Sequence, residues 1–288
     1  MEFLLWHYPQ FLFLAPTVGL LILITVYPLL FSLWISVQNY ELGIRGGLVS
    51  FAGLQNFVDA VKSTLFHEAF MYTIIFTVGA VGLEFVLGIG IALLLNREFK
   101  GRDLVRTIIV LPMMVTPVAA GLIWKLIFES FGLVNYFLKT VGLPTKIWLQ
   151  DPTWSLPACI LVDVWQWTPF MILIFLSGLL VLPREPFEAA IIDGASRLQM
   201  FRHLTLPMLR MLILTAVLIR MMDAFKAFDM IYVLTGGGPG NKTEVVSLHI
   251  YLSGLKWGHL GYAAAMSYIV LIVIILIAQA LFRTMGKE

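Results

Sequence analysis

The chain has 288 residues, of which 60% are apolar and only 12% are charged, and its mean hydropathy is +0.92. A soluble domain of this composition would expose large apolar patches, so the composition predicts a polytopic membrane protein. The formal net charge of +2 is too small and too dispersed to indicate a nucleic-acid partner. A single cysteine, Cys159, excludes an internal disulfide and any site built from several thiolates.

Six apolar stretches are long enough to cross a bilayer, which takes roughly 18 or more residues. The predicted spans cover residues 11–37, 69–95, 107–124, 155–182, 209–234 and 260–282. Backbone groups in hydrocarbon must be hydrogen-bonded within each segment, so we expect an all-α fold. The start of the chain lacks the Lys or Arg of a signal peptide, and the apolar run behind it is too long for one, so we expect a retained first span. The prediction is one transmembrane domain, residues 1–288.

The distribution of basic residues predicts the orientation of the spans. One side of the predicted topology carries Arg97, Lys100, Arg102, Arg106, Arg184, Arg197, Arg202, Arg210, Arg283 and Lys287. The other side has Arg45, Lys62, Lys139, Lys146, Lys242 and Lys256, spread through longer connections, with Lys125 at the end of a span. Because cytoplasmic loops are enriched in Lys and Arg, we expect both termini, and the connection after the fourth span, on the cytoplasmic side.

The connection between the fourth and fifth predicted spans, residues 184–207, is polar and has a helical pattern. The pattern is interrupted at Asp193 and Gly194, restarts behind Ser196 as an N-cap candidate and stops at Pro207. This predicts a short helix-turn-helix.

The connection contains a spaced motif in which Glu188-Ala189-Ala190 is followed by Gly194, and then by Leu204-x-Leu206-Pro207. This spacing resembles the coupling loop of ABC-importer permeases. In that family the loop fits a cleft on a cytoplasmic ATPase. The resemblance implies ATPase-coupling roles for Glu188, Ala189, Ala190, Asp193, Gly194, Leu206 and Pro207.

A second pattern sharpens the resemblance. It runs from Arg220-Met-Met-Asp223-Ala-Phe-Lys226 through Gly236-Gly-Gly-Pro239, then Thr243-Glu244 and Gly261-Tyr-Ala-Ala-Ala. This series is similar to binding-protein-dependent sugar permeases, of the subunit type with the Gly-Gly-Gly-Pro loop. The resemblance implies the type I importer permease fold in a bacterial or archaeal cytoplasmic (inner) membrane. It also implies a second homologous permease, two ATPases that bind ATP and Mg, an external substrate-binding protein, and no cofactor in this chain.

The glycine-rich stretch from Gly236 to Thr243 is the nearest approach to a phosphate-binding loop. Asn241 stands where such a loop needs Gly before Lys242, and Pro239 interrupts it. We interpret it as a tight turn after the fifth span, because Gly supplies positive φ and Pro stops a helix.

Charges recur in the fifth predicted span with alternating sign. Arg220, Asp223, Lys226 and Asp229 are spaced every three residues, so successive members would be helix neighbours. Intramembrane charges are costly and usually face a bundle interior or an aqueous cavity. Two interpretations stay open: a self-paired ladder that locks helices, or a lining of a sugar path.

The fourth predicted span places aromatic rings beside a carboxylate, as a saccharide pocket requires. Asp163, Trp165, Trp167 and Phe170 lie close in sequence, and Pro169 frees an upstream carbonyl. For both Trp165 and Trp167 an interfacial belt position is the alternative. Together with the resemblance to maltose-type members, the pattern gives these substrate-binding candidates: Asp163, Trp165, Phe170, Arg220, Asp223 and Ala224.

Other features of the chain indicate rival functions more weakly. Glu84, amid Gly82, Gly88 and Gly90, fits a proton relay, although the glycines more simply allow close helix packing. Pro112 and Pro117 predict bends in the third span. The scattered histidines lack the spacing of metal ligands, and no nucleophile-base motif occurs, so we predict neither a metal site nor catalytic residues.

These observations predict a non-catalytic permease subunit that imports a di- or oligosaccharide or a polyol, in contact with membrane lipid and without nucleic acid. The same machinery importing a sugar phosphate is the alternative. A proton-coupled secondary transporter, a membrane-embedded enzyme and a non-transporting assembly or signalling protein are the rivals from other classes.

Overall fold

The computed structural model describes residues 9–42 and 50–285, and of residues 9–13, 281, 284 and 285 only the backbone. Arg45 and Lys287, which enter the orientation argument, lie outside the described residues, as do the first eight residues of the predicted uncleaved start. The described residues form two compact units, one within residues 9–66 and 249–272 and the other within residues 67–248 and 273–285.

The first unit begins with a long exposed helical run and continues into a compact group of short helices and strands. The run consists of α2 (Pro9–Leu21), the π-helical η1 (Ile22–Val26) and α3 (Tyr27–Ser36). The remainder comprises β1 (Gln38–Asn39) paired antiparallel with β2 (Ser50–Phe51), α4 (Gln55–Lys62), the first turn of α5 (Thr64–Leu95), η4 (Leu252–Lys256) and the first part of α16 (Leu260–Met285).

Hydrogen bonds from side chains to the backbone connect these short elements. The buried Asn56 amide donates to the carbonyl oxygens of Ser36 and Gln38, each at 2.9 Å, which ties α4 to the end of α3. At Gly261 a Cβ would lie 2.1 Å from the Gln38 carbonyl oxygen. Only glycine therefore allows α16 to begin so close to β1.

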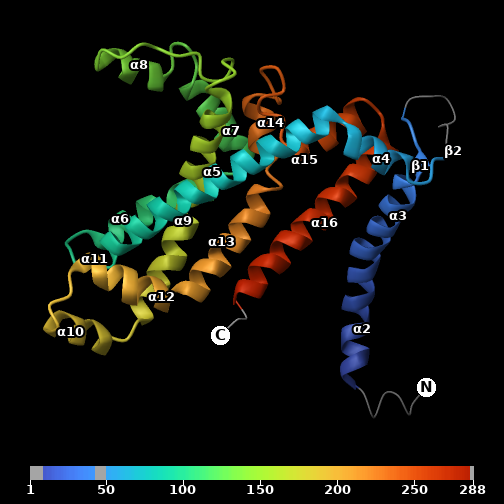
Figure 1. The fold of residues 1–288 in the computed structure, drawn as a ribbon. Coiled ribbons are helices and arrows are strands. Elements are labelled where there is room, and N and C mark those ends of the chain that lie inside the picture. The colour runs from blue at the N-terminus through green and yellow to red at the C-terminus, as the bar shows by residue number, and fades with distance from the viewer. Residues whose placement is uncertain (1–8, 43–49, 286–288) are drawn as a thin grey trace. The chain divides into compact units, whose positions relative to one another are not determined.

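The second unit contains most of the remaining helices. They are the rest of α5 (Thr64–Leu95), α6 (Arg102–Val110), η2 (Leu111–Met114), α7 (Pro117–Ile127), α8 (Leu133–Thr140), α9 (Ser155–Val181), α10 (Glu185–Ile192), α11 (Arg197–Met200), η3 (Phe201–Thr205), α12 (Leu206–Met208), α13 (Arg210–Ala224), α14 (Asp229–Leu234), the start of α15 (Val246–Tyr251) and the end of α16 (Leu260–Met285). Within this unit α8 and α10 lie at opposite ends of α9 (Figure 1).

Four described helices are long and apolar enough to cross a membrane on their own: Leu14–Ser36, Thr64–Leu95, Ser155–Val181 and Leu260–Ala280. Two bent pairs raise the number to six if each pair counts as one span. The first pair bends by 98° between Met114 and Pro117, and the second by 70° between Met208 and Arg210. The bends expected at Pro112 and Pro117 are confirmed, and so is the all-α class.

Glycines let α9 approach its neighbours closely. At Gly88 on α5 a Cβ would lie 2.6 Å from the Cβ of Met171, and at Gly178 on α9 it would lie 2.8 Å from Leu209. Gly82 and Gly90 have no atom within 4 Å of such a Cβ. Of the three glycines around Glu84, only Gly88 therefore serves the close packing predicted from sequence.

Candidate functional site

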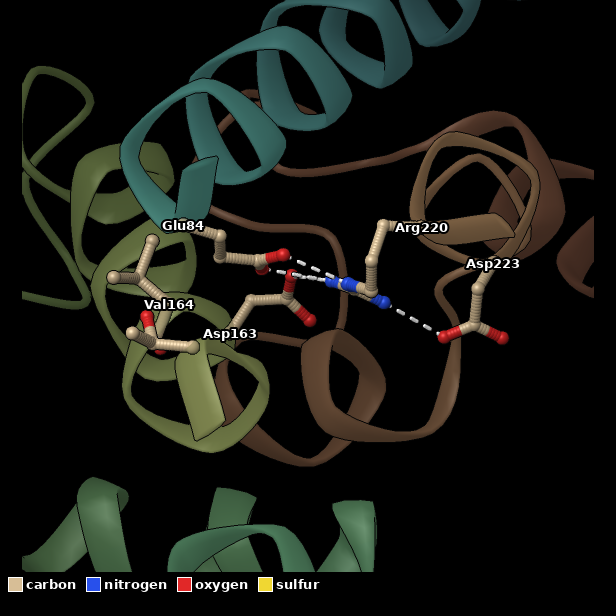
Figure 2. Close-up of polar contacts among 6 residues, drawn as sticks. Glu84, Asp163, Val164, Arg220 and Asp223 are labelled. Carbon is tan, nitrogen blue, oxygen red and sulfur yellow. Dashed lines mark hydrogen bonds and ion pairs between the residues drawn. The ribbon is translucent and has the colours of Figure 1, made fainter. Parts of the chain in front are cut away.

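A buried cluster of charged side chains joins α5, α9 and α13 (Figure 2). Arg220 donates to both carboxylate oxygens of Glu84, from Nε to Oε2 at 2.7 Å and from Nη2 to Oε1 at 2.8 Å. Its Nη2 also donates to Asp163 Oδ2 at 2.7 Å. Because the paired hydrogen bonds of Arg to a carboxylate are short and directional, they hold the guanidinium in one orientation.

Asp223 extends the cluster from the helix core to an accessible surface. Arg220 Nη1 donates to Asp223 Oδ2 at 2.8 Å. The side chains of Arg220, Glu84 and Asp163 are 2%, 0% and 7% exposed, whereas that of Asp223 is 49% exposed. Three carboxylates thus share one guanidinium, and only the last of them faces open space.

The predicted four-member ladder is wrong beyond its first pair. The period of three requires a continuous helix, but α13 ends at Ala224 and the chain turns until α14 begins at Asp229. Lys226 and Asp229 are exposed, and neither forms an ion pair in the part of the chain that the structure describes. The main partner of Arg220 is instead Glu84, 136 residues away in sequence.

Glu84 is therefore not an isolated carboxylate. Both of its oxygens accept hydrogen bonds from Arg220, and its side chain is fully buried. The proton-relay interpretation rested on a lone carboxylate in the membrane, whereas Glu84 is the ion-pair partner of Arg220. The relay is left without the free carboxylate that suggested it.

Two hollows adjoin the exposed end of the cluster. The first hollow, about 280 Å³, includes Asp163, Gln166, Trp167, Asp223, Ala224, Lys226, Phe228 and Asp229 among its lining residues. The second hollow, about 330 Å³, is lined by Trp167, Phe170, Ile219, Arg220, Met222, Asp223 and Lys226. Trp167, Asp223 and Lys226 border both. Five of the six predicted substrate-binding residues thus line one hollow or the other.

Trp165, the sixth candidate, lines neither hollow. Its ring meets that of Trp124 edge to face, with 5.6 Å between centroids. The aromatic residue beside both hollows is Trp167, whose ring centroid lies 4.9 Å from Arg220 Cζ, and which meets Phe170 edge to face at 6.5 Å. A cation over an indole ring is attracted by the ring quadrupole, so Arg220 also orients Trp167.

The connection between α9 and α13 has the predicted helix-turn-helix form. α10 ends at Ile192, Gly194 takes φ +79°, and Ser196 caps α11 in a capping box with Gln199. No atom lies within 4 Å of a Cβ built on Gly194. The left-handed backbone, rather than crowding, therefore favours glycine at this position.

Apolar side chains stand uncovered on this connection. Ile191, Ile192 and Leu198 are 63%, 86% and 74% exposed. Glu188 and Ala189 on α10 are exposed beside them, and Ala190 is half-buried. Leu206 and Pro207 lie in α12, which leads into α13. Sequence inspection singled out the charged and small residues but missed the isoleucines, which their position on a polar loop could have indicated.

The glycine-rich segment forms the turn predicted for it. Gly236, Gly237 and Gly240 all have positive φ. The Thr243 hydroxyl donates to the Gly238 carbonyl at 2.8 Å, which closes the loop. Lys242 Nζ donates to the Tyr72 hydroxyl at 2.9 Å, and this hydrogen bond raises the pKa of Lys242 above its usual range. The positive φ values and these hydrogen bonds give the segment the form of a tight turn.

Comparison with known proteins places this geometry in a family. Residues 84–284 match the family described as binding-protein-dependent transport system inner membrane component. A probable ABC transporter permease, y4oQ of Sinorhizobium fredii, is 41% identical over 270 residues, 93% of this chain and 87% of the relative. The trehalose/maltose transport system permease MalF of Thermococcus litoralis is 34% identical over 266 residues, 92% of this chain and 89% of the relative.

A solved structure has the same fold. One chain of a bacterial alginate ABC transporter, in complex with an alginate pentasaccharide-bound periplasmic protein, superposes with a TM-score of 0.83 at 25% identity. The match covers 100% of this chain and 98% of the other. The fold and the ion-paired helix core therefore belong to a multi-pass membrane transport subunit of ABC type. The chain is a member of the family of binding-protein-dependent transport system inner membrane components.

Proposed function

We propose that this chain is a permease subunit of an ATP-driven importer that moves a di- or oligosaccharide or a polyol across the cytoplasmic membrane. The observation that carries the proposal is Trp167 beside Asp223 at two adjoining hollows. Sugars present apolar C–H faces and polar hydroxyl edges, which an indole plane and a carboxylate oxygen match. Relatives named for trehalose and maltose, and for alginate, support a saccharide as the cargo.

The permease works with partners. A second homologous permease completes the path, two cytoplasmic ATPases bind ATP and Mg, and an external binding protein delivers the sugar. Glu188, Ala189, Ala190, Asp193, Gly194, Leu206 and Pro207 belong to the segment that transmits ATPase closure to α9 and α13. The exposed Ile191 and Ile192 support this role, because uncovered apolar residues on a polar loop indicate a protein contact.

The proposed topology has both termini and α10 in the cytoplasm and the connection containing α8 outside. The opposite placement of α8 and α10 at the ends of α9 is compatible with it (Figure 1). The test is cysteine labelling from each side of sealed vesicles, in a chain whose Cys159 has been replaced. Labels near Lys100 and Arg197 should react only from the cytoplasm, and one near Lys242 only from outside. Reversed accessibility overturns the orientation.

The transport proposal is tested in liposomes that contain the chain, its second permease, the ATPase and the binding protein. We expect uptake of a neutral saccharide that requires ATP and the binding protein and survives a protonophore. A proton-coupled carrier would instead lose uptake with the proton gradient and ignore ATP. An assembly or signalling protein would show no uptake in either condition.

A further inference from the structure

The exposed carboxylate of Asp223 is held in place from behind. Its Oδ2 accepts a hydrogen bond from Arg220 Nη1, while its Oδ1 has no partner among the residues that the structure describes. Arg220 is itself fixed by the two-point bond to Glu84 and by Asp163. The free Oδ1 is therefore a preorganised acceptor beside both hollows (Figure 2).

The charges around the hollows are predominantly negative. Asp163, Asp223 and Asp229 line the first hollow, whose lining holds one cation, Lys226. Arg220 borders the second hollow, but Glu84, Asp163 and Asp223 already accept hydrogen bonds from four of its five N–H groups. With Glu84 behind them, four carboxylates outnumber two cations. An anion entering here meets a net negative charge, and the guanidinium is already paired with three carboxylates.

We propose that Asp223 and Trp167 make this chain's part of the path selective for neutral or amine-bearing saccharides and against carboxylated, sulfonated or phosphorylated ones. The inference rests on the proposed transport function and adds the substrate's charge class to it. Trp167 offers its indole face to the sugar ring, and Asp223 Oδ1 accepts from a hydroxyl or an ammonium group. An ionised acidic group in the same place has no proton to donate to Asp223 Oδ1 and is repelled by its charge.

Arg220 acts as a positioning residue in this arrangement. It touches Asp223 through a hydrogen bond and Trp167 through its guanidinium, so it orients both members of the pair. Lys226 is the matched neighbour: it borders the same hollows and is exposed, but has no ion pair among the described residues. Removing its charge makes the hollows more negative, whereas removing that of Asp223 makes them less so. The two substitutions should shift charge selectivity in opposite directions.

The experiment measures uptake of a neutral disaccharide and of its uronate derivative by the complete transporter in liposomes, at saturating binding protein. The readout is the ratio of uronate to neutral uptake, compared between wild type and variant, because the same binding protein serves both. Asp223→Asn keeps an oxygen for Arg220 and removes the charge. We expect it to raise the ratio about tenfold, the effect of roughly 1.4 kcal/mol. Lys226→Gln should lower the ratio.

The outcomes separate this inference from the proposed function. ATP-dependent uptake of the uronate by wild type as readily as of the neutral sugar overturns the inference and leaves the importer intact. An equal loss of both substrates in Asp223→Asn, with no change in ratio, also overturns it. Absence of ATP-dependent uptake for any saccharide instead contradicts the proposed function. If Asp223→Asn fails to insert, Asp229→Asn on the exposed rim of the first hollow carries the same expectation.

Discussion

The ion-paired core of α5, α9 and α13 differs from the connection between α9 and α13 in how far its side chains are paired and buried. In the core, every carboxylate of the cluster has a guanidinium donor, and three of the four charged side chains are almost fully buried. In the connection, large apolar side chains stand in the open on a polar loop. The charges of the first region are paired within one chain, whereas the second region leaves apolar side chains uncovered. Substitutions should accordingly damage stability in one and assembly in the other.

The largest effect is expected from Arg220→Ala. It leaves Glu84 and Asp163 buried without a counter-charge, and breaking such a pair typically costs about 3–5 kcal/mol. We expect a large fall in the melting temperature of the detergent-purified chain. Lys226→Ala removes an exposed cation nearby and should change stability little. Combining Arg220→Ala with Glu84→Gln and Asp163→Asn should recover part of the loss; no recovery would mean that the charge imbalance is not the cause.

Gly194→Pro should remove transport rather than stability. Proline fixes φ near −65°, whereas the turn at Gly194 needs +79°. The connection would lose its turn, while the ion-paired core lies elsewhere. We expect normal insertion with ATP-driven uptake reduced to background. Gly194→Asn, which tolerates positive φ, should retain most uptake. Equal uptake by the Pro variant would remove the turn from the coupling mechanism.

Ile192→Asp tests whether the exposed apolar residues are a binding surface. Ile192 is 86% exposed in this chain, so a charge there should change its stability by less than about 0.5 kcal/mol. A charge buried in an interface with the ATPase should weaken association at least tenfold, measured by co-purification across an ATPase titration. The control is Ile147→Asp. Ile147 is also exposed but lies in the connection between α8 and α9, so this substitution should leave association unchanged. Unaltered association in both variants would show that Ile192 does not contact the ATPase.

The smallest effect distinguishes the two tryptophans of α9. Trp165→Ala removes an edge-to-face contact with Trp124, and such contacts contribute about 0.5–1.5 kcal/mol beyond area burial. A double-mutant cycle with Trp124→Ala should reveal coupling of that size in thermal stability. Trp167→Ala should instead raise the KM for sugar uptake. An increase in KM for Trp165→Ala equal to that for Trp167→Ala would indicate that Trp165 also contacts the substrate.

Local features of this chain were predictable from sequence, and long-range pairings were not. The turn at Gly194 and the cap at Ser196 follow from residue types within one turn of helix. The bond between Glu84 and Arg220 joins residues 136 positions apart, and helix periodicity says nothing about such a partner. One signal was available: spans two, four and five each carry a deep charge, and buried opposite charges pair.

The assignment of the aromatic plane failed for a related reason. Trp165 and Trp167 are two residues apart, so they point to different sides of α9, and composition cannot say which side borders a hollow. The break of α13 at Ala224 was likewise hidden, because neither proline nor glycine occurs between residues 225 and 234. The sequence therefore predicts one helix for the fifth span, whereas the structure has two, α13 and α14. The single-domain prediction and the coupling roles stay predictions.

Gly88 and Glu84 lie one turn apart on the same face of α5, and the missing side chain at Gly88 sets how near α5 comes to α9 at Met171. An alanine at position 88 would push the helices apart and stretch the 2.7 Å contact between Arg220 and Glu84. We expect related proteins with a larger residue at position 88 to have a smaller residue at position 171, or different charges at positions 84, 163 or 220. The identities of these positions should therefore change together, so that one small residue ties the evolution of a helix contact to that of a salt bridge.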